Sequence, residues 1–534
     1  MAEDECPGGE VAEGGGETGT GSALRTIGWG ALLVSGGEAL YNLLLWLSGV
    51  VMIGRYWGAE ILGSFGVTMV VSRMSDVLGR AGLPVTNIRF LPEFWAHGNL
   101  KAVRSAAWFT TLVAAATGTA AGAALWFAAP LIAVGFYHRP DLTGAFRLAA
   151  LMAPLTTVML TALAVPQAAK DALPFVLVSR IGVPLCGLIG TGIAVWAHGG
   201  LATLLWVQVA ALAIGSVASV LFMLRSLPKG PGTADAPVKW GRIARFSALM
   251  CLKGLSRFGL SVLDIILLGR FVNDRELGVY IAAQRISLFI TFPRRAIAPI
   301  YMPTVAEQHA RGDRARMEAV YATTRRWVTG LALVIFGVMV IAPREVMATG
   351  GHELALGGAA LIVLCVSNLT ESCLGGANEV LLMSGGQKVA TITEWAGVVI
   401  LAVTLPPLAT KWGIMGACWS NLLAQGSVNI ARQLWLSAHL KFHQFDRRFV
   451  WAALPSAALI TVLALGGGWF GGGLVSAIIR VAIFAVLFSI ILIAGWLPEL
   501  RVGGRLRLPS RNLLSSGALE ATEPGPGSAA EQDP

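Results

Sequence analysis

The sequence is poor in charged residues, and this shortage excludes an ordinary soluble protein. Only 13% of its 534 residues are charged and 55% are hydrophobic, whereas a soluble domain usually has about 25% charged residues. The apolar residues gather in long runs such as 29–53, 110–134 and 474–497. About 20 apolar residues cross a bilayer as a helix. The composition therefore predicts a polytopic membrane protein.

Motifs of several enzyme classes are also missing. The sequence has no G-x-x-x-x-G-K-[ST] nucleotide loop, no H-E-x-x-H zinc motif and no D-x-D in a loop. The histidines are scattered in or near loops, and none of the six cysteines forms a C-x-x-C pair. We therefore expect no catalytic residue, no metal site and no other cofactor, and we interpret the cysteines as small core residues.

The net charge of +10 is distributed as in a membrane protein, not as in a nucleic-acid-binding protein. Most basic residues lie in short loops between apolar runs or at the ends of those runs. If the N-terminus is placed in the cytoplasm, 26 basic residues fall on the cytoplasmic side and 7 on the opposite side, as the positive-inside rule favours. We expect a multi-pass protein with both termini inside and no nucleic-acid partner.

The hydropathy pattern predicts an all-α protein with about 14 transmembrane helices. The segments 1–25 and 498–534 are rich in small and polar residues, so we expect both to be disordered cytoplasmic tails. The expected spans are 27–53, 61–87, 105–135, 145–166, 173–197, 201–224, 245–270, 277–303, 326–343, 355–384, 389–409, 413–436, 450–470 and 473–497.

An internal repeat divides these spans into two lobes. Gly54-Arg55-Tyr56 is followed by Gly63, and Gly269-Arg270-Phe271 is followed at the same distance by Gly278. The offset covers six spans, so the copies share one orientation and form a parallel repeat. We expect a six-helix lobe at 26–224, a cytoplasmic linker at 225–244, a second six-helix lobe at 245–437 and two extra helices at 448–497.

These segments resemble the polysaccharide (O-antigen type) flippases of the multidrug/oligosaccharidyl-lipid/polysaccharide exporter superfamily. The resemblance rests on 54–65, on 264–271 with 277–286, and on a Pro303 to Gly312-Asp313 segment that matches Pro92 to Gly98-Asn99. It implies a two-lobed carrier in a bacterial inner membrane. It also implies movement of undecaprenyl-pyrophosphate-linked oligosaccharide to the periplasmic leaflet by alternating access, without ATP hydrolysis by this chain.

Charged residues inside spans are the candidate site residues, because they usually face a bundle interior or a watery cavity. The candidates for substrate binding are cations in the second, seventh and eighth spans: Arg73, Arg80, Lys253, Arg257 and Arg285. Arginine offers a planar fork and lysine a point charge to a pyrophosphate. Two simpler interpretations stay open, a self-neutralising group of Arg73, Asp76 and Arg80, and a Lys253 that snorkels to the surface.

Carboxylates inside spans are candidates for ion coupling or for ion pairs in the lumen: Glu38, Asp76, Asp264, Glu371 and Glu394. The repeat offset places Glu38 opposite Lys253 of the other lobe, and a static interhelical pair is the simpler alternative. Coupling to a proton gradient, a sodium gradient or the membrane potential is expected from such a carrier.

Four functions remain open at this stage. A flippase for lipid-linked oligosaccharide suits the cationic spans, with membrane lipids, a polysaccharide polymerase and glycosyltransferases as further partners. A lipid II flippase of peptidoglycan synthesis, a cation-coupled drug antiporter of the same fold and a membrane polysaccharide polymerase are the alternatives. The clustered arginines argue against the antiporter, and the short outside loops argue against the polymerase.

Overall fold

The computed structural model describes residues 34–230, 240–374, 376–440, 447–466, 474–502 and 505–506. Almost all of them are helical, which confirms the predicted all-α class. In this described part, nine segments are long and apolar enough to cross a membrane. Two of the nine, Val34–Ala96 with 63 residues and Gln387–Leu440 with 54, are longer than one span needs. The total of fourteen spans therefore stays a prediction. The tail 1–25, most of the tail 498–534 and residues 231–239 of the linker 225–244 lie outside the described residues.

The first lobe, called the N-lobe, begins with a helical stretch at 34–45. Its further elements are η1 (Trp46–Ile53), α2 (Gly54–Arg80), α3 (Leu83–Ala96), α4 (Leu100–Pro130), η2 (Leu131–Phe136), α5 (Leu142–Ala150), α6 (Met152–Ala168), α7 (Leu173–Phe175), η3 (Val176–Gly182), α8 (Val183–Trp196) and α9 (Leu201–Ser226).

The second lobe, called the C-lobe, contains α10 (Trp240–Leu268), α11 (Asp274–Ser287), η4 (Leu288–Thr291), α12 (Phe292–Ala310), α13 (Arg314–Ile341), α14 (Pro343–Ala348), η5 (His352–Gly357), α15 (Gly358–Leu374), α16 (Gly376–Met383) and α17 (Gln387–Leu440). The chain continues with α18 (Arg447–Leu465), α19 (Leu474–Leu500), β1 (Arg501–Val502) and β2 (Arg505–Leu506). The two short strands pair antiparallel at the start of the segment predicted to be disordered.

Two glycines break segments that otherwise read as continuous helices. Gly58 in α2 has φ 77° and Gly413 in α17 has φ 54°, values that favour glycine because it lacks a Cβ. A Cβ placed on Gly416 would overlap the carbonyl oxygen of Leu408. Eight residues cover about 12 Å along a straight helix, so the chain reverses at Gly413. The break coincides with the predicted boundary between spans 389–409 and 413–436.

The internal repeat is visible in the turns of the two lobes. Gly98 and Gly312 have φ values of 68° and 69°. Each is followed by an N-cap residue, Asn99 or Asp313, whose side chain accepts a hydrogen bond from the backbone three residues later at 2.9 Å. Matching sequences in the two halves thus fold into matching glycine turns and helix caps.

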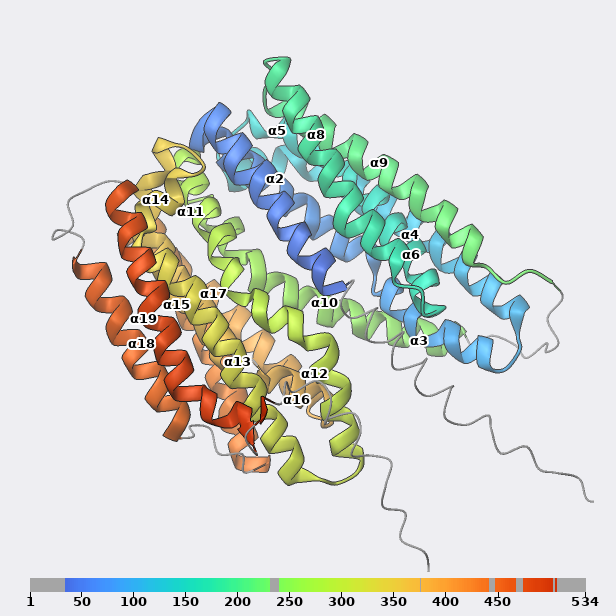
Figure 1. Ribbon diagram of the computed structural model, residues 1–534. Coiled ribbons are helices and arrows are strands. Elements are labelled where there is room, and N and C mark those ends of the chain that lie inside the picture. The colour runs from blue at the N-terminus through green and yellow to red at the C-terminus, as the bar shows by residue number, and fades with distance from the viewer. Residues whose placement is uncertain are drawn as a thin grey trace, which may run out of the picture.

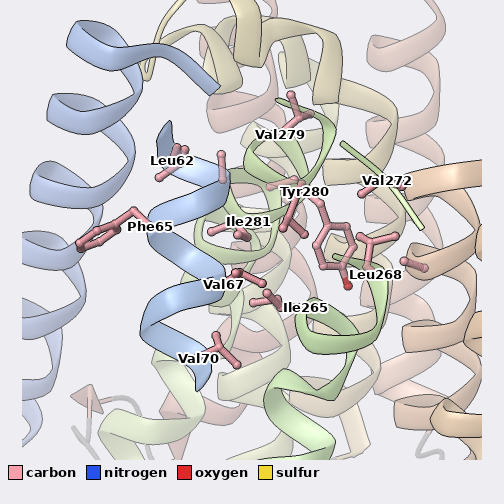
Figure 2. Packing of buried hydrophobic residues seen from close by; sticks show 14 of the residues in the cluster. Leu62, Phe65, Val67, Val70, Ile265, Leu268, Val272, Val279, Tyr280 and Ile281 are labelled. Carbon is pink, nitrogen blue, oxygen red and sulfur yellow. The ribbon is translucent and has the colours of Figure 1, made fainter. Parts of the chain in front are cut away.

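The lobes converge at α2 and α11 and spread apart toward α3 and α12 (Figure 1). Gly63 and Gly278, which occupy the same position in the two repeats, meet at this crossing: a Cβ on either one would overlap the backbone of the other helix. Figure 2 shows Val67 and Val70 of α2 facing Ile281 and Ile265 of the C-lobe. The absence of side chains at the two glycines lets the helices approach closely enough to pack these apolar residues.

The helices α18 and α19 lie against α13 (Figure 1). Buried Arg480 of α19 donates a hydrogen bond to the carbonyl oxygen of Ile341 at 2.9 Å, at the end of α13. This side chain therefore satisfies a helix terminus, as expected for an arginine packed against a neighbouring helix.

A two-chambered cavity between the lobes

Two adjoining chambers lie at the centre of the molecule. The interlobe chamber, about 310 Å³, is lined mainly by α10, α11, α12, α15 and α17, with residues of 42–46 and α2 on its N-lobe side. The N-lobe chamber, about 580 Å³, is lined mainly by α2, α6, η3 and α8. Leu45 and Arg73 line both chambers, so the two spaces meet at Arg73.

Three predicted binding residues lie on the wall of the interlobe chamber without an ion-pair partner. They are Arg73 of α2, Arg257 of α10 and Arg285 of α11. Across the described ranges, no carboxylate pairs with any of the three. A Cβ on Gly49 would lie 2.9 Å from a guanidinium nitrogen of Arg285, so this C-lobe side chain reaches the first N-lobe helix. Cations of both lobes therefore face one space.

The remaining arginines of this chamber are neutralised by carboxylates. Arg294 binds Glu371 at 2.5 Å and Glu379 at 2.6 Å. Arg432 binds Glu394 at 3.1 Å, and the same carboxylate accepts a hydrogen bond from Ser256. The predicted carboxylates Glu371 and Glu394 thus form static pairs here, and the charge left for a ligand is that of the three unpaired arginines.

Glu38 links the lobes through two arginines. Its carboxylate lies 3.3 Å from Arg180 of the N-lobe and 3.5 Å from Arg295 of the C-lobe. The hydroxyl of Ser35 donates to the carbonyl oxygen of Ala296 beside this pair. The C-lobe partner of Glu38 is therefore Arg295, and not the Lys253 that the repeat offset predicts. The repeat predicts only which residues correspond in sequence. The packing of α12 against the N-lobe brings Arg295, a cation later in the chain than Lys253, next to Glu38.

Asp264 is fully buried behind the wall of the interlobe chamber. One carboxylate oxygen accepts hydrogen bonds from Tyr280 at 2.6 Å, Gln284 at 2.8 Å and Asn421 at 2.9 Å. Gln284 and Asn421 also line the chamber. In this arrangement Asp264 organises three donors of α11 and α17 and makes no ion pair within the described chain.

Two further candidates differ in their surroundings. Asp76 pairs with Arg80 at 3.0 Å, and both line the N-lobe chamber beside the unpaired Arg73. Lys253 is half-buried on α10 and lies on the wall of neither chamber. The geometry thus separates Lys253 from the arginines, while the binding role of every candidate stays a prediction.

The sequence interpretation missed three arginines of the chamber wall. Arg294, Arg295 and Arg432 lie toward the ends of expected spans, and the structure places all three on the wall of the interlobe chamber. Their carboxylate partners stabilise them inside the protein. One feature of the sequence could have indicated buried arginine partners: three glutamates lie within the tenth and eleventh expected spans.

The lobes are joined at the end of the molecule that carries Arg139. Asp274 of α11 accepts a hydrogen bond from Ser64 of α2 at 2.8 Å and pairs with Arg139. Arg139 also donates to the carbonyl oxygen of Val272, and Arg270 donates to that of Phe136. This group of contacts, called the Arg139 latch, joins the two lobes near the crossing of α2 and α11.

Comparisons with known proteins agree with this architecture. The sequence profile described as "Polysaccharide biosynthesis protein" matches residues 95–352. The probable low-salt glycan biosynthesis flippase Agl15 of Haloferax volcanii is 21% identical over 224 residues, which cover 41% of this chain and 46% of Agl15. The match therefore spans about half the length of that relative.

Solved transporter structures share the fold over most of their length. The lipid II flippase MurJ in an inward closed conformation has a TM-score of 0.69 at 12% identity, and the match covers 87% of this chain and 99% of MurJ. An inward-facing multidrug resistance MATE transporter has a TM-score of 0.61 at 14% identity, covering 76% of this chain and 94% of the transporter. These matches confirm the resemblance predicted from the sequence: the chain is a polytopic membrane protein with the fold of the multidrug/oligosaccharidyl-lipid/polysaccharide exporter superfamily, similar to its polysaccharide flippases.

Proposed function

We propose that this protein moves a lipid-linked oligosaccharide of the undecaprenyl-pyrophosphate type from the cytoplasmic to the periplasmic leaflet of a bacterial inner membrane. The lobes would rock about the two chambers and expose them to each side in turn, with both chain termini in the cytoplasm. The chain would work as a secondary carrier and not as an enzyme, coupled to an ion gradient or to the membrane potential. The match to a glycan biosynthesis flippase supports this class of cargo.

One observation carries the proposal: Arg73, Arg257 and Arg285 face a single cavity from both lobes and lack carboxylate partners in the described chain. A diphosphate between sugar and lipid presents several anionic oxygens. Bidentate arginine forks match this geometry and form strong charge-assisted hydrogen bonds. A ligand held by arginines of both lobes also ties its binding to their relative position, as alternating access requires.

The charge of the chamber argues against a cationic drug as cargo. Among the described residues, six arginines and three glutamates line the interlobe chamber. All three glutamates are paired with arginine, so a cation would meet an excess of positive charge. Lipid II contains the same diphosphate, so the experiment below compares both cargoes.

The test uses a bacterial strain that lacks its own polysaccharide flippase and carries this chain in its place. Arg257→Ala should lower export of the lipid-linked glycan by at least about tenfold, since each lost charge-assisted contact is worth about 1.5–3 kcal/mol. Arg245→Ala is the matched control, because Arg245 is exposed on the same helix outside both chambers. Protein levels are compared by immunoblot.

Full export by Arg257→Ala at normal protein level would reject the assignment of this site. A second strain, depleted of its lipid II flippase, tests the other cargo. Growth of that strain on this chain, together with failure in the first strain, would replace the proposed oligosaccharide by lipid II.

A further inference from the structure

We infer that the N-lobe chamber is the binding site for the sugars attached to the diphosphate, while the three arginines hold the diphosphate itself. This inference rests on the proposed function and adds a second subsite to it. The starting point is Arg73, which lies on the boundary of the two chambers. If a diphosphate binds at Arg73, the sugar attached to it must extend into one of the two chambers.

The interlobe chamber is the more highly charged of the two chambers. Beyond the three arginines, its wall carries Arg295 and the ion pairs of Arg294 and Arg432 with three glutamates. These pairs use the charged groups for one another and hold them in fixed positions. Seven amide side chains also line it, and five of them form hydrogen bonds within the described chain: Asn42, Gln284, Asn368, Asn421 and Gln425. The chamber is also the smaller of the two, at about 310 Å³ against about 580 Å³. Small-molecule sites generally measure about 300–1,000 Å³.

The N-lobe chamber combines aromatic walls with amide groups that remain available. Gln167 of α6 and Gln208 of α9 both line it. Their side chains are half-buried, and neither forms a hydrogen bond with another residue of the described chain. An amide group offers both a donor and an acceptor, as does each sugar hydroxyl. Two unused amides in a partly enclosed space are therefore matched to a hydroxyl-rich ligand.

Every charged described residue on the wall of the N-lobe chamber has an ion-pair partner except Arg73, which lies at the boundary with the interlobe chamber. Asp76 pairs with Arg80. Arg180 pairs with Glu38 and lies between the rings of Tyr41 and Phe175, at 5.0 and 5.1 Å from their centroids. Only Arg73 remains unpaired among the charged described residues on this wall. A neutral ligand attached to an anion at Arg73 fits this distribution better than a second charged group.

The experiment measures binding to the purified full chain in lipid nanodiscs. The probes are a synthetic prenyl diphosphate and the same molecule bearing one hexose or one N-acetylhexosamine. We expect at least one of the sugars to strengthen binding to the wild type about tenfold, the sum of two modest hydrogen bonds. Gln208→Leu and Gln167→Leu should each remove a large part of this gain and leave the affinity for the sugar-free probe unchanged.

Gln387→Leu is the matched control, because Gln387 is exposed at the start of α17 and lines neither chamber. It should keep the full gain. If a leucine variant does not fold, Gln208→Ala provides the same comparison with a smaller side chain. Unchanged affinity for the sugar-free probe shows that each variant is folded.

Three results would overturn the inference. If neither sugar strengthens binding to the wild type, or if the gain survives in both glutamine variants, the sugars bind elsewhere although the diphosphate site stands. If the leucine variants bind the sugar-free probe more tightly, the chamber holds the prenyl tail. If the wild type binds no prenyl diphosphate at all, the proposed function fails, and the sugar subsite with it.

Discussion

Charged side chains inside a membrane protein carry a cost of about 3 kcal/mol or more each, and this chain handles that cost in two ways. Arg294, Arg295 and Arg432 are paired with glutamates. Arg73 and Arg257 instead stay exposed to the chamber. The presence or absence of a carboxylate partner thus separates the two groups of arginines by a physical criterion.

The unpaired arginines of the chamber wall were predictable from sequence, whereas the paired ones were not. Arg73 and Arg257 lie deep inside apolar runs, where a charge has no access to a loop. Arg295 and Arg432 lie near the ends of such runs, where the same residue usually snorkels to the surface. Their pairing with Glu38 and Glu394 depends on helix packing across 257 and 38 positions of sequence, which no local pattern encodes.

Asp264 provides a prediction about stability at the residue scale. Tyr280→Phe removes one of the three side-chain hydrogen bonds to this buried carboxyl group and should lower the free energy of unfolding by about 1–3 kcal/mol. Thermal unfolding of the purified protein measures the change. Tyr301→Phe is the control, since the buried Tyr301 hydroxyl has no hydrogen-bond partner in the described chain. Equal midpoints for both variants would show that the Tyr280 bond contributes nothing.

At the scale of helices, the crossing of α2 and α11 depends on two glycines in equivalent repeat positions. The repeat predicted that Gly63 and Gly278 correspond, because their surroundings match in sequence. It did not predict that they touch, since corresponding residues need not lie on the axis that relates the lobes. The structure places them there, with Val67 and Ile281 packed alongside (Figure 2).

Enlarging one of these glycines tests the crossing. Gly63→Ala brings a methyl group into the backbone of α11 and should cost about 1–3 kcal/mol through overpacking. The thermal midpoint of the purified protein should fall accordingly. Gly144→Ala makes the same change on helix α5 where a Cβ meets no atom within 4 Å, so it should be neutral or stabilising. A midpoint for Gly63→Ala equal to that of Gly144→Ala would refute tight packing at this crossing.

At the scale of the whole molecule, the two-lobed arrangement followed from the repeat, but the conformation did not. The same apolar spans suit a carrier that is open to either side of the membrane, because the hydropathy of the helices does not depend on which ends of the lobes are in contact. The conformation is defined by the contacts between the lobes. In this structure the Arg139 latch joins one end, and the pairing of Glu38 with Arg295 joins the lobes at a second place. Transport by alternating access requires these two groups of contacts to break in turn.

The central claim is that unpaired arginines of both lobes hold the diphosphate of a lipid-linked sugar. A structure of the chain bound to a prenyl diphosphate in a lipid nanodisc tests this claim most directly. The account predicts phosphate oxygens within hydrogen-bonding distance of Arg73, Arg257 and Arg285 together. A diphosphate bound away from these guanidinium groups, with all three still facing an unoccupied chamber, would contradict it.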